Sequence, residues 1–210
     1  MPKLALLLAI VWFLVLFVAR SVIQRARTGS TGFKGFEGRP GSVSWWAGVT
    51  ASAGLVLAPL APVFVLRGWP GGRLWLEASG LHALGAGLAT VGIAGALAAQ
   101  LEMGPSWRIG VDAKEKTELV ESGLFGLVRN PIFSFILAST FGLVLLVPCA
   151  VALAAMLLVW LGIELQVRAV EEPYLLRVHG PRYAGYASRI GRFVPGIGRL
   201  ASRGGGGSGG

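Results

Sequence analysis

Five apolar runs divide this chain, and they restrict it to folds that a lipid bilayer can hold. Hydrophobic residues make up 54% of its 210 residues and charged residues only 14%, well below the roughly 25% of ordinary soluble domains. A helix needs about 20 apolar residues to cross a bilayer. The expected spans are residues 4–23, 45–66, 74–99, 132–147 and 150–162. We therefore predict an all-α, polytopic membrane protein with about five transmembrane helices.

The first run and the last two runs leave alternatives open. The first could be a cleaved signal peptide, but it is too long for one and no small-x-small cleavage site follows, which favours a retained span. The last two runs are joined only by a turn at Pro148 and are near the shortest length that crosses a bilayer. We expect them to form a tight helical hairpin, with a re-entrant hairpin as the alternative.

The third run is rich in glycine and alanine. Gly85 and Gly92 would let another helix approach closely. His82 lies in the same run, and we expect it to be a hydrogen-bonded packing residue rather than a catalytic group. A gap between this run and the hairpin would give a lipophilic ligand a lateral entrance from the bilayer.

The basic residues are distributed unevenly about the five spans. Lys3, Arg67 and Arg73 fall on one side, and the other 16 of the 19 lysines and arginines fall on the opposite side. The positive-inside rule then places the N-terminus on the outer side of the membrane and the long polar segments and the C-terminus on the cytoplasmic side. A bacterial-type inner membrane is the expected location. The net charge of +9 is expected to meet anionic membrane lipids, not nucleic acid.

Composition also suggests how the chain is organised. Residues 1–99 would form an N-terminal three-span region, and residues 100–203 a loop, the hairpin and a basic, amphipathic C-terminal helix in the cytoplasm. The Gly-Ser segment at residues 204–210 is interpreted as an appended linker outside the fold. The single cysteine, Cys149, excludes an intrachain disulfide and a cysteine-based metal site, and we predict no metal. We expect Cys149 to be a small buried apolar residue.

Charged residues follow the last apolar run at helical spacing. Glu164, Arg168, Glu171 and Glu172 fall at i, i+4, i+7 and i+8, which is one face of a helix. Glu164 still lies among apolar residues, and a carboxylate at that depth should face protein or a water-filled pocket rather than lipid. A solvated face with i,i+4 ion pairs is the simpler alternative.

A polar turn precedes the hairpin. Gly123 permits a turn, and Pro131 can start the next helix while it holds Asn130 away from helical geometry. The turn would present backbone N–H groups, Arg129 and the Asn130 amide where the span emerges. We expect these groups to form a cradle for a polar ligand.

Taken together and in order, these pieces resemble the isoprenylcysteine carboxyl methyltransferase family, which belongs to a wider group that includes the phospholipid N-methyltransferases. The resemblance covers about residues 104–195. It rests on Leu119-Val120-x-x-Gly123-x-Phe125-x-x-x-Arg129-Asn130-Pro131-x-Phe133, an apolar hairpin, Glu171-Glu172-x-x-Leu175, His179-Gly180-x-x-Tyr183-x-x-Tyr186 and Arg192-Phe193-Val194-Pro195.

The resemblance implies methyl transfer from S-adenosylmethionine at the cytoplasmic membrane face, to a lipophilic small molecule or a lipidated acceptor. It assigns to the cofactor site Leu119, Val120, Gly123, Arg129, Asn130, Pro131, Phe133, Glu171 and Glu172, with Tyr183 and Tyr186 closing the site from the C-terminal helix.

Three positions depart from the family pattern. Asn130 and Thr117 stand where many members have histidine, and Phe133 where many have tyrosine. Asparagine can form hydrogen bonds but cannot titrate near neutral pH, so histidine-based proton transfer at position 130 is excluded.

The acceptor decides which groups the reaction needs. A carboxylate acceptor needs only a guanidinium to hold it, and Arg168 is the candidate. An amine or thiol acceptor needs a base, and Glu164 is the best-placed one. A nicotinamide-dependent membrane reductase of related architecture and a non-enzymatic scaffold or transporter are the rival functions; the oligomeric state stays open.

Overall fold

The computed structural model describes residues 1–31, 38–69, 79–107 and 118–201, and within these ranges the chain is helical and forms no strand. The helices are α1 (Pro2–Phe13), the π-helical η1 (Leu14–Ala19), α2 (Arg20–Thr28), α3 (Val43–Leu66), α4 (Ser79–Glu102), the 3₁₀ turns η2 (Gly104–Ser106) and η3 (Gly123–Gly126), α5 (Pro131–Leu146), α6 (Ala150–Leu165), the π-helical η4 (Gln166–Glu171) and α7 (Glu172–Arg189).

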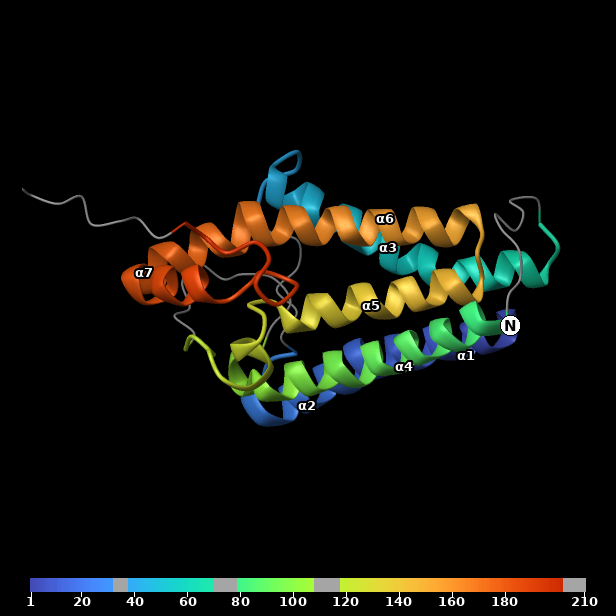
Figure 1. The fold of residues 1–210 in the computed structure, drawn as a ribbon, viewed down its shortest axis with the longest axis horizontal. Coiled ribbons are helices and arrows are strands. Elements are labelled where there is room, and N and C mark those ends of the chain that lie inside the picture. Colours follow the sequence, from blue (N-terminus) through green and yellow to red (C-terminus); the bar gives the residue numbers. More distant parts are fainter. Residues whose placement is uncertain (32–37, 70–78, 108–117, 202–210) are drawn as a thin grey trace, which may run out of the picture.

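The long helices lie side by side and the chain runs back and forth between two ends of the bundle (Figure 1). In the described part of the chain, four continuous helices are long and apolar enough to cross a membrane: Pro2–Thr28, Val43–Leu66, Ser79–Glu102 and Ala150–Arg189. The last of these has its apolar part in α6. The prediction of an all-α polytopic membrane protein is confirmed. α5 is apolar but has only 16 residues, about 24 Å of helix, so its full crossing of the bilayer stays a prediction.

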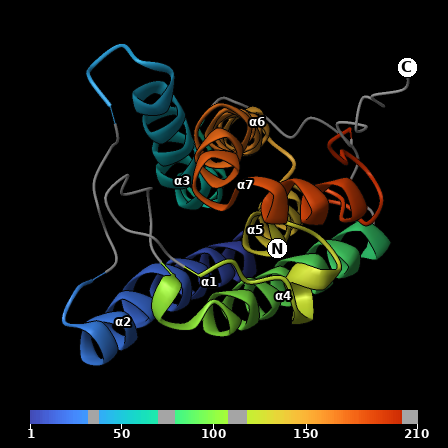
Figure 2. The same cartoon turned by 90° about the vertical axis from the view of Figure 1, so that its left-hand side faces the viewer.

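The closest helix pairs are not the pair joined by the shortest turn. α4 packs along α5, and α3 packs along α6, whereas the consecutive helices α5 and α6 touch less (Figure 2). Glycine makes the first pair possible, because a Cβ built on Gly92 would lie 2.6 Å from the backbone nitrogen of Ser139. The expected close approach at Gly85 and Gly92 is therefore confirmed. The lateral gap expected between α4 and the hairpin is wrong, because these glycines bring the α4 backbone onto α5.

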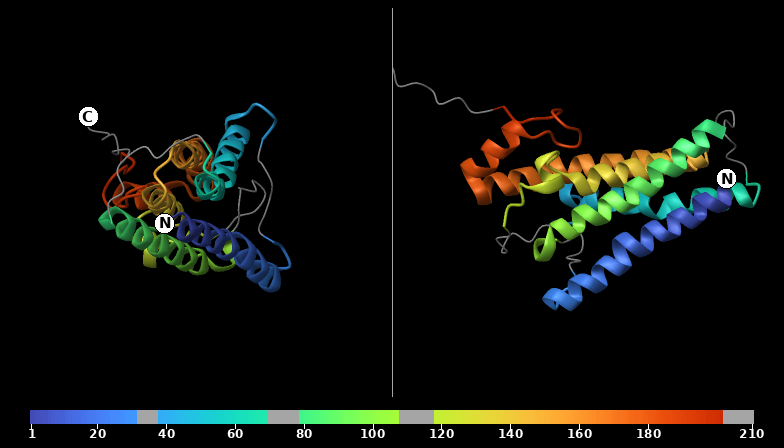
Figure 3. Two further views of the ribbon diagram at one scale, coloured as in Figure 1. Left: turned by 90° about the vertical axis from the view of Figure 1, so that its right-hand side faces the viewer. Right: turned by 60° about the horizontal axis from the view of Figure 1, so that its bottom comes forward.

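An apolar core joins these pairs to the N-terminal helix. Trp12 of α1 and Leu16 of η1 are buried in one cluster with Ile93 of α4 and with Val159 and Ile163 of α6. The N-terminal helix then diverges from the others toward α2 (Figure 3). The boundary proposed between residues 99 and 100 falls inside α4, in the last turn of that helix.

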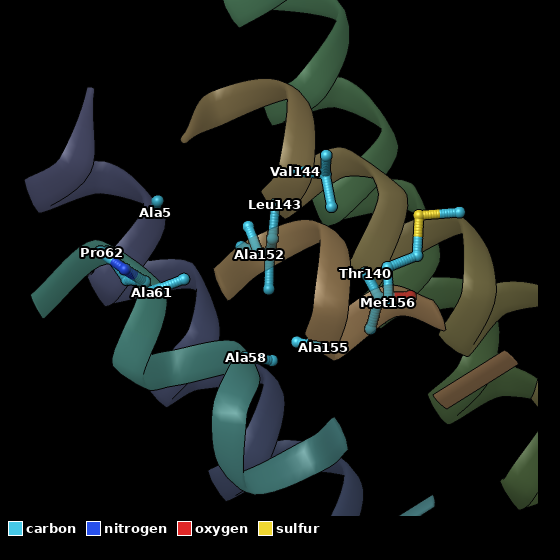
Figure 4. A pocket seen from close by; sticks show the side chains of 10 residues that line it. All are labelled: Ala5, Ala58, Ala61, Pro62, Thr140, Leu143, Val144, Ala152, Ala155 and Met156. Carbon is cyan, nitrogen blue, oxygen red and sulfur yellow. The ribbon is translucent and has the colours of Figure 1, made fainter. Parts of the chain in front are cut away.

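An apolar cavity lies between α1, α3, α5 and α6 (Figure 4). Half of the residues that line it are alanines, and the hydroxyl of Thr140 in its lining donates to the carbonyl oxygen of Ile136 at 3.0 Å. Thr140 is ten residues from Asn130 along α5, about 15 Å. The cavity is thus separate from the charged residues at the end of the bundle, where the candidate site lies.

Candidate functional site

A buried glutamate bound by two arginines forms the centre of the candidate site. Arg129, which precedes α5, donates from Nη2 to Oε1 of Glu172 at 2.6 Å. Arg192, which follows α7, donates from Nε to Oε1 and from Nη2 to Oε2 of Glu172, both at 2.8 Å. The three residues are 5%, 5% and 8% exposed, respectively. Such charge-assisted, forked hydrogen bonds are the strong ones in proteins.

The two arginines and one glutamate carry a net positive charge. All three lie outside the apolar helices α5 and α6. Burial raises the pKa of the Glu172 carboxyl, but the hydrogen bonds from Arg192 and Arg129 outweigh burial and leave the pKa below its usual value. The hydrogen bond to Glu172 raises the pKa of Arg192. Glu172 is therefore a carboxylate at neutral pH, held by two guanidinium groups, and the cluster favours a further anionic partner.

Arg129 also fixes the C-terminal segment to the start of α5. Its Nη1 donates to the carbonyl oxygen of Ala187 at 3.0 Å and to that of Ile190, and its Nη2 donates to the carbonyl oxygen of Gly198 at 3.0 Å. Both terminal nitrogens of Arg129 are thereby engaged within the protein. The side chain thus binds three carbonyl oxygens that lie 58 to 69 residues further along the chain.

The polar turn before α5 has the predicted groups, but the chain itself occupies its donors. The backbone N–H groups of Arg129 and Asn130 donate to the carbonyl oxygens of Gly191 at 2.8 Å and Arg192 at 3.1 Å. Nδ2 of Asn130 donates to that same Arg192 oxygen at 3.2 Å. Pro131 is buried at the first turn of α5, as its position predicts. The turn therefore holds the segment after α7 and does not present free backbone donors.

The turn η3 is held from two sides. The hydroxyl of Tyr186 donates to the carbonyl oxygen of Phe125 at 2.6 Å, and the backbone N–H of Leu124 donates to Oε2 of Glu102 at 2.9 Å. Gly123 begins the turn with a φ of 59°, a conformation that favours glycine. The turn is thus joined to the ends of both α4 and α7.

Two tyrosines and a leucine form an apolar wall beside the charged cluster. Tyr183 and Tyr186 are buried, with ring centroids 6.1 Å apart, and Leu119 packs against them. Burial raises the pKa of Tyr183 to about 12, and the charge of Glu172 adds to this effect. The two tyrosines thus lie near Glu172, and their role in a cofactor site stays a prediction. Val120, which follows Leu119 in the sequence, is half-buried.

The remaining predicted residues lie around this centre rather than in it. Arg168 is exposed and its Nε donates to Oε2 of Glu164 within the same helix, an i,i+4 ion pair. Glu171 accepts a hydrogen bond from Gln166 at 3.4 Å. Phe133 is half-buried against the core cluster that contains Trp12 and Leu16. The charged residues after the last span thus divide into the exposed pair and the buried Glu172. Thr117 and the linker at 204–210 lie outside the described residues.

Two residues of this site were missed by the sequence reasoning. Arg192 is the bidentate partner of Glu172, although its only signal was its place in the Arg-Phe-Val-Pro pattern. Glu102 ends α4 and accepts a hydrogen bond from the Leu124 N–H, and no spacing rule links positions 102 and 124.

His82 is buried in α4, and Cys149 is buried as expected. The described residues contain no cluster of three or more potential metal-ligating histidine, cysteine or acidic side chains.

Comparison with known families gives one match. The sequence pattern of the phospholipid methyltransferase family matches residues 81–182, which run from α4 into α7 and include Arg129 and Glu172. The searches of curated proteins and of solved structures find no match. The family match confirms the resemblance drawn from the motifs and indicates a methyltransferase.

Proposed function

We propose that this chain transfers a methyl group from S-adenosylmethionine to a lipophilic or lipidated acceptor at the cytoplasmic face of the membrane. The observation that carries the proposal is the buried Glu172, bound by Arg129 and Arg192 and lying beside two buried tyrosines at the charged end of an apolar bundle. Arg129 and Glu172 both belong to the part of the chain that matches the methyltransferase family.

The side chains at this site suit the groups of the methyl donor, which has a sulfonium, an ammonium and a carboxylate. The arginine pair leaves one positive charge in excess over Glu172, which would attract the donor carboxylate. Nη1 of Arg192 makes no hydrogen bond to the described residues, so Arg192 is a better candidate for that contact than Arg129, whose terminal nitrogens are occupied. Glu171 and Glu172 would face the ammonium. The ring of Tyr183, Tyr186 or Phe133 would meet the sulfonium by cation–π attraction.

S-adenosylmethionine supplies an electrophilic methyl group on sulfur. The acceptor atom forms a bond to the methyl carbon as the carbon–sulfur bond breaks, and the electron pair of the broken bond stays on sulfur. The positive charge on sulfur disappears in this step, and a partly dry site favours that loss of charge. The chain's own contribution would be to hold the two reactants in line. The apolar side chains Leu119 and Val120 and the turn at Gly123 would exclude water from one side of the site.

The methyl acceptor would bind at the ion pair of Glu164 and Arg168. For a carboxylate acceptor, Arg168 would hold the nucleophile; for an amine or thiol, Glu164 would take the proton. Glu164 and Arg168 are already paired with each other, so an acceptor that used either group would first separate them. The positive-inside rule supports a cytoplasmic site, because the basic residues gather at this end of the bundle.

The first test measures ligand binding. Purified protein in detergent is heated alone and with S-adenosylmethionine, S-adenosylhomocysteine or reduced nicotinamide dinucleotide. A ligand that binds only the folded protein raises the unfolding temperature by mass action. We expect stabilisation by the two sulfur compounds and none by the nicotinamide. Stabilisation by the nicotinamide alone would replace the proposal with the reductase, and no stabilisation by any of them would refute both.

The second test identifies the acceptor. Membranes or lipid extracts are incubated with the protein and donor carrying a labelled methyl group, and the labelled products are separated. We expect label in a lipophilic product, and the chemistry of that product tells whether oxygen, nitrogen or sulfur is methylated. Label found only in water-soluble products would contradict the proposed acceptor class.

A further inference from the structure

Glu102 connects the end of α4 to the turn that precedes the candidate site. Its Oε2 accepts the N–H of Leu124 at 2.9 Å across 22 residues of sequence. Leu124 lies in η3, immediately after Gly123. A carboxylate acceptor makes a charge-assisted hydrogen bond, which is stronger than one to a neutral oxygen. The contact therefore stabilises this conformation of η3 more than a neutral acceptor would.

Gly123 shows that the carboxylate of Glu102 and the turn are closely fitted. A Cβ built on Gly123 would lie 2.7 Å from Oε2 and 2.9 Å from Oε1 of Glu102. The absence of a side chain at position 123, together with its φ of 59°, lets the carboxylate approach the backbone. The same turn is held on its other side by Tyr186, through the carbonyl oxygen of Phe125.

The helix end that bears Glu102 is itself fixed by a buried arginine. Arg20 is fully buried, and its Nη2 donates to the carbonyl oxygens of Gln100 at 3.3 Å and Gly104 at 2.9 Å. Its guanidinium carbon also lies 4.3 Å from the centre of the Trp107 ring. A cation at the C-terminal end of a helix satisfies carbonyls that lack partners. Arg20 therefore binds both the last turn of α4 and the segment that follows it.

We infer that Glu102 is a positioning residue of the methyl-donor site. Glu102 fixes η3 and therefore also the adjoining Leu119–Gly123 segment. Arg20 acts through Glu102, because it holds the end of α4. The inference rests on the proposed function, because it takes this segment as part of the donor site. It also brings a residue of the N-terminal helix, outside the stretch that matches the family, into the support of that site.

The test compares Glu102→Ala with Glu102→Gln, which keeps an oxygen acceptor for the Leu124 N–H. Glu118→Ala is the matched control, since it removes an exposed carboxylate nearby that has no assigned role. Two readouts are used: hydrogen exchange of the peptide containing Leu124 in the ligand-free protein, and the Kd for S-adenosylhomocysteine. We expect Glu102→Ala to speed exchange and raise the Kd about fivefold, Glu102→Gln to restore most of both, and Glu118→Ala to change neither.

Each other outcome has a defined meaning. Unchanged exchange and Kd in Glu102→Ala, with wild-type protein binding normally, would overturn the inference alone. Faster exchange with an unchanged Kd would overturn it too, because Glu102 would then serve only the fold. Failure of the wild-type protein to bind S-adenosylhomocysteine would overturn the proposed function and, with it, this inference. A kinetic measurement separates the roles further: a positioning role predicts a larger effect on the KM for the donor than on kcat.

Discussion

Nη2 of Arg129 and Oε1 of Glu172 lie 2.6 Å apart, although 43 residues and two apolar helices separate them in sequence. Both side chains are buried, and Arg192 completes the cluster from the other side of Glu172. This contact closes the charged end of the bundle, because it joins the start of α5 to the start of α7.

Replacing Glu172 with glutamine should destabilise the protein. The change leaves two buried guanidinium groups without a counter-charge, and loss of one member of a buried ion pair costs about 3–5 kcal/mol. Thermal unfolding in detergent measures the loss, and calorimetry with S-adenosylhomocysteine should show weaker binding. Glu121→Gln is the control: it removes a carboxylate from the exposed pair with Arg182, and its effect should be at most about 1 kcal/mol. Equal effects of the two changes would contradict a special role for Glu172.

Replacing Arg192 with lysine tests the forked geometry. Lysine keeps the charge but cannot donate to both carboxylate oxygens from a planar group, so the free energy of unfolding should fall by about 1–3 kcal/mol. The Kd for S-adenosylhomocysteine should rise if Arg192 also meets the donor carboxylate. Arg182→Lys, at an exposed position, should leave stability and binding nearly unchanged. Wild-type behaviour of Arg192→Lys in both measurements would show that charge alone suffices.

Stability should fall in acid because of Glu172. Its pKa in the folded protein lies below the ordinary value of 4.5, so the stabilisation is complete above that value and is lost as the pH falls through the folded value. Unfolding temperatures measured from about pH 7 down to about pH 3 should show this loss. The loss should be smaller in Glu172→Gln, where no carboxyl titrates. The same acid dependence in both proteins would assign it to other groups.

The close packing of α4 on α5 can be tested at one glycine. In Gly92→Ala the new methyl group would lie 2.6 Å from the Ser139 nitrogen and 2.7 Å from the Phe135 carbonyl oxygen, so the helices must separate. We expect a loss of about 1–3 kcal/mol in stability. Gly87→Ala, where the added atom meets nothing within 4 Å, should be neutral or stabilising by up to about 1 kcal/mol. Equal tolerance at both positions would show that α4 and α5 are not in contact there.

The sequence predicted the helices better than their partners. Apolar runs set the position of α3, α5 and α6 to within a few residues, because burial in lipid needs long apolar stretches. The same runs wrongly suggested a gap beside the glycine-rich helix. Hydropathy reports which residues avoid water, but it does not say which helix faces which. That depends on shape, and here on Gly92 meeting the backbone near Ser139.

The candidate site was predicted in part. Arg129 and Glu172 were both identified, and their proximity was implied by the family resemblance; the pairing of Arg192 with Glu172 was not. The stripe from Glu164 to Glu172 was read as one group of charges, whereas the structure separates an exposed ion pair from a buried carboxylate. Helical spacing places residues on a face, but burial of that face depends on the segment after α7 that folds back over it.

The sequence by itself determined that this chain is a helical membrane protein with most of its basic residues on one side, because the cost of placing charged and unpaired polar groups in lipid is a local property of each segment. Only the tertiary structure decided that Glu172 is held by arginines from both sides and that Glu102 reaches the turn at Leu124. Those contacts join positions far apart in the chain, and their geometry follows from how closely the helices pack.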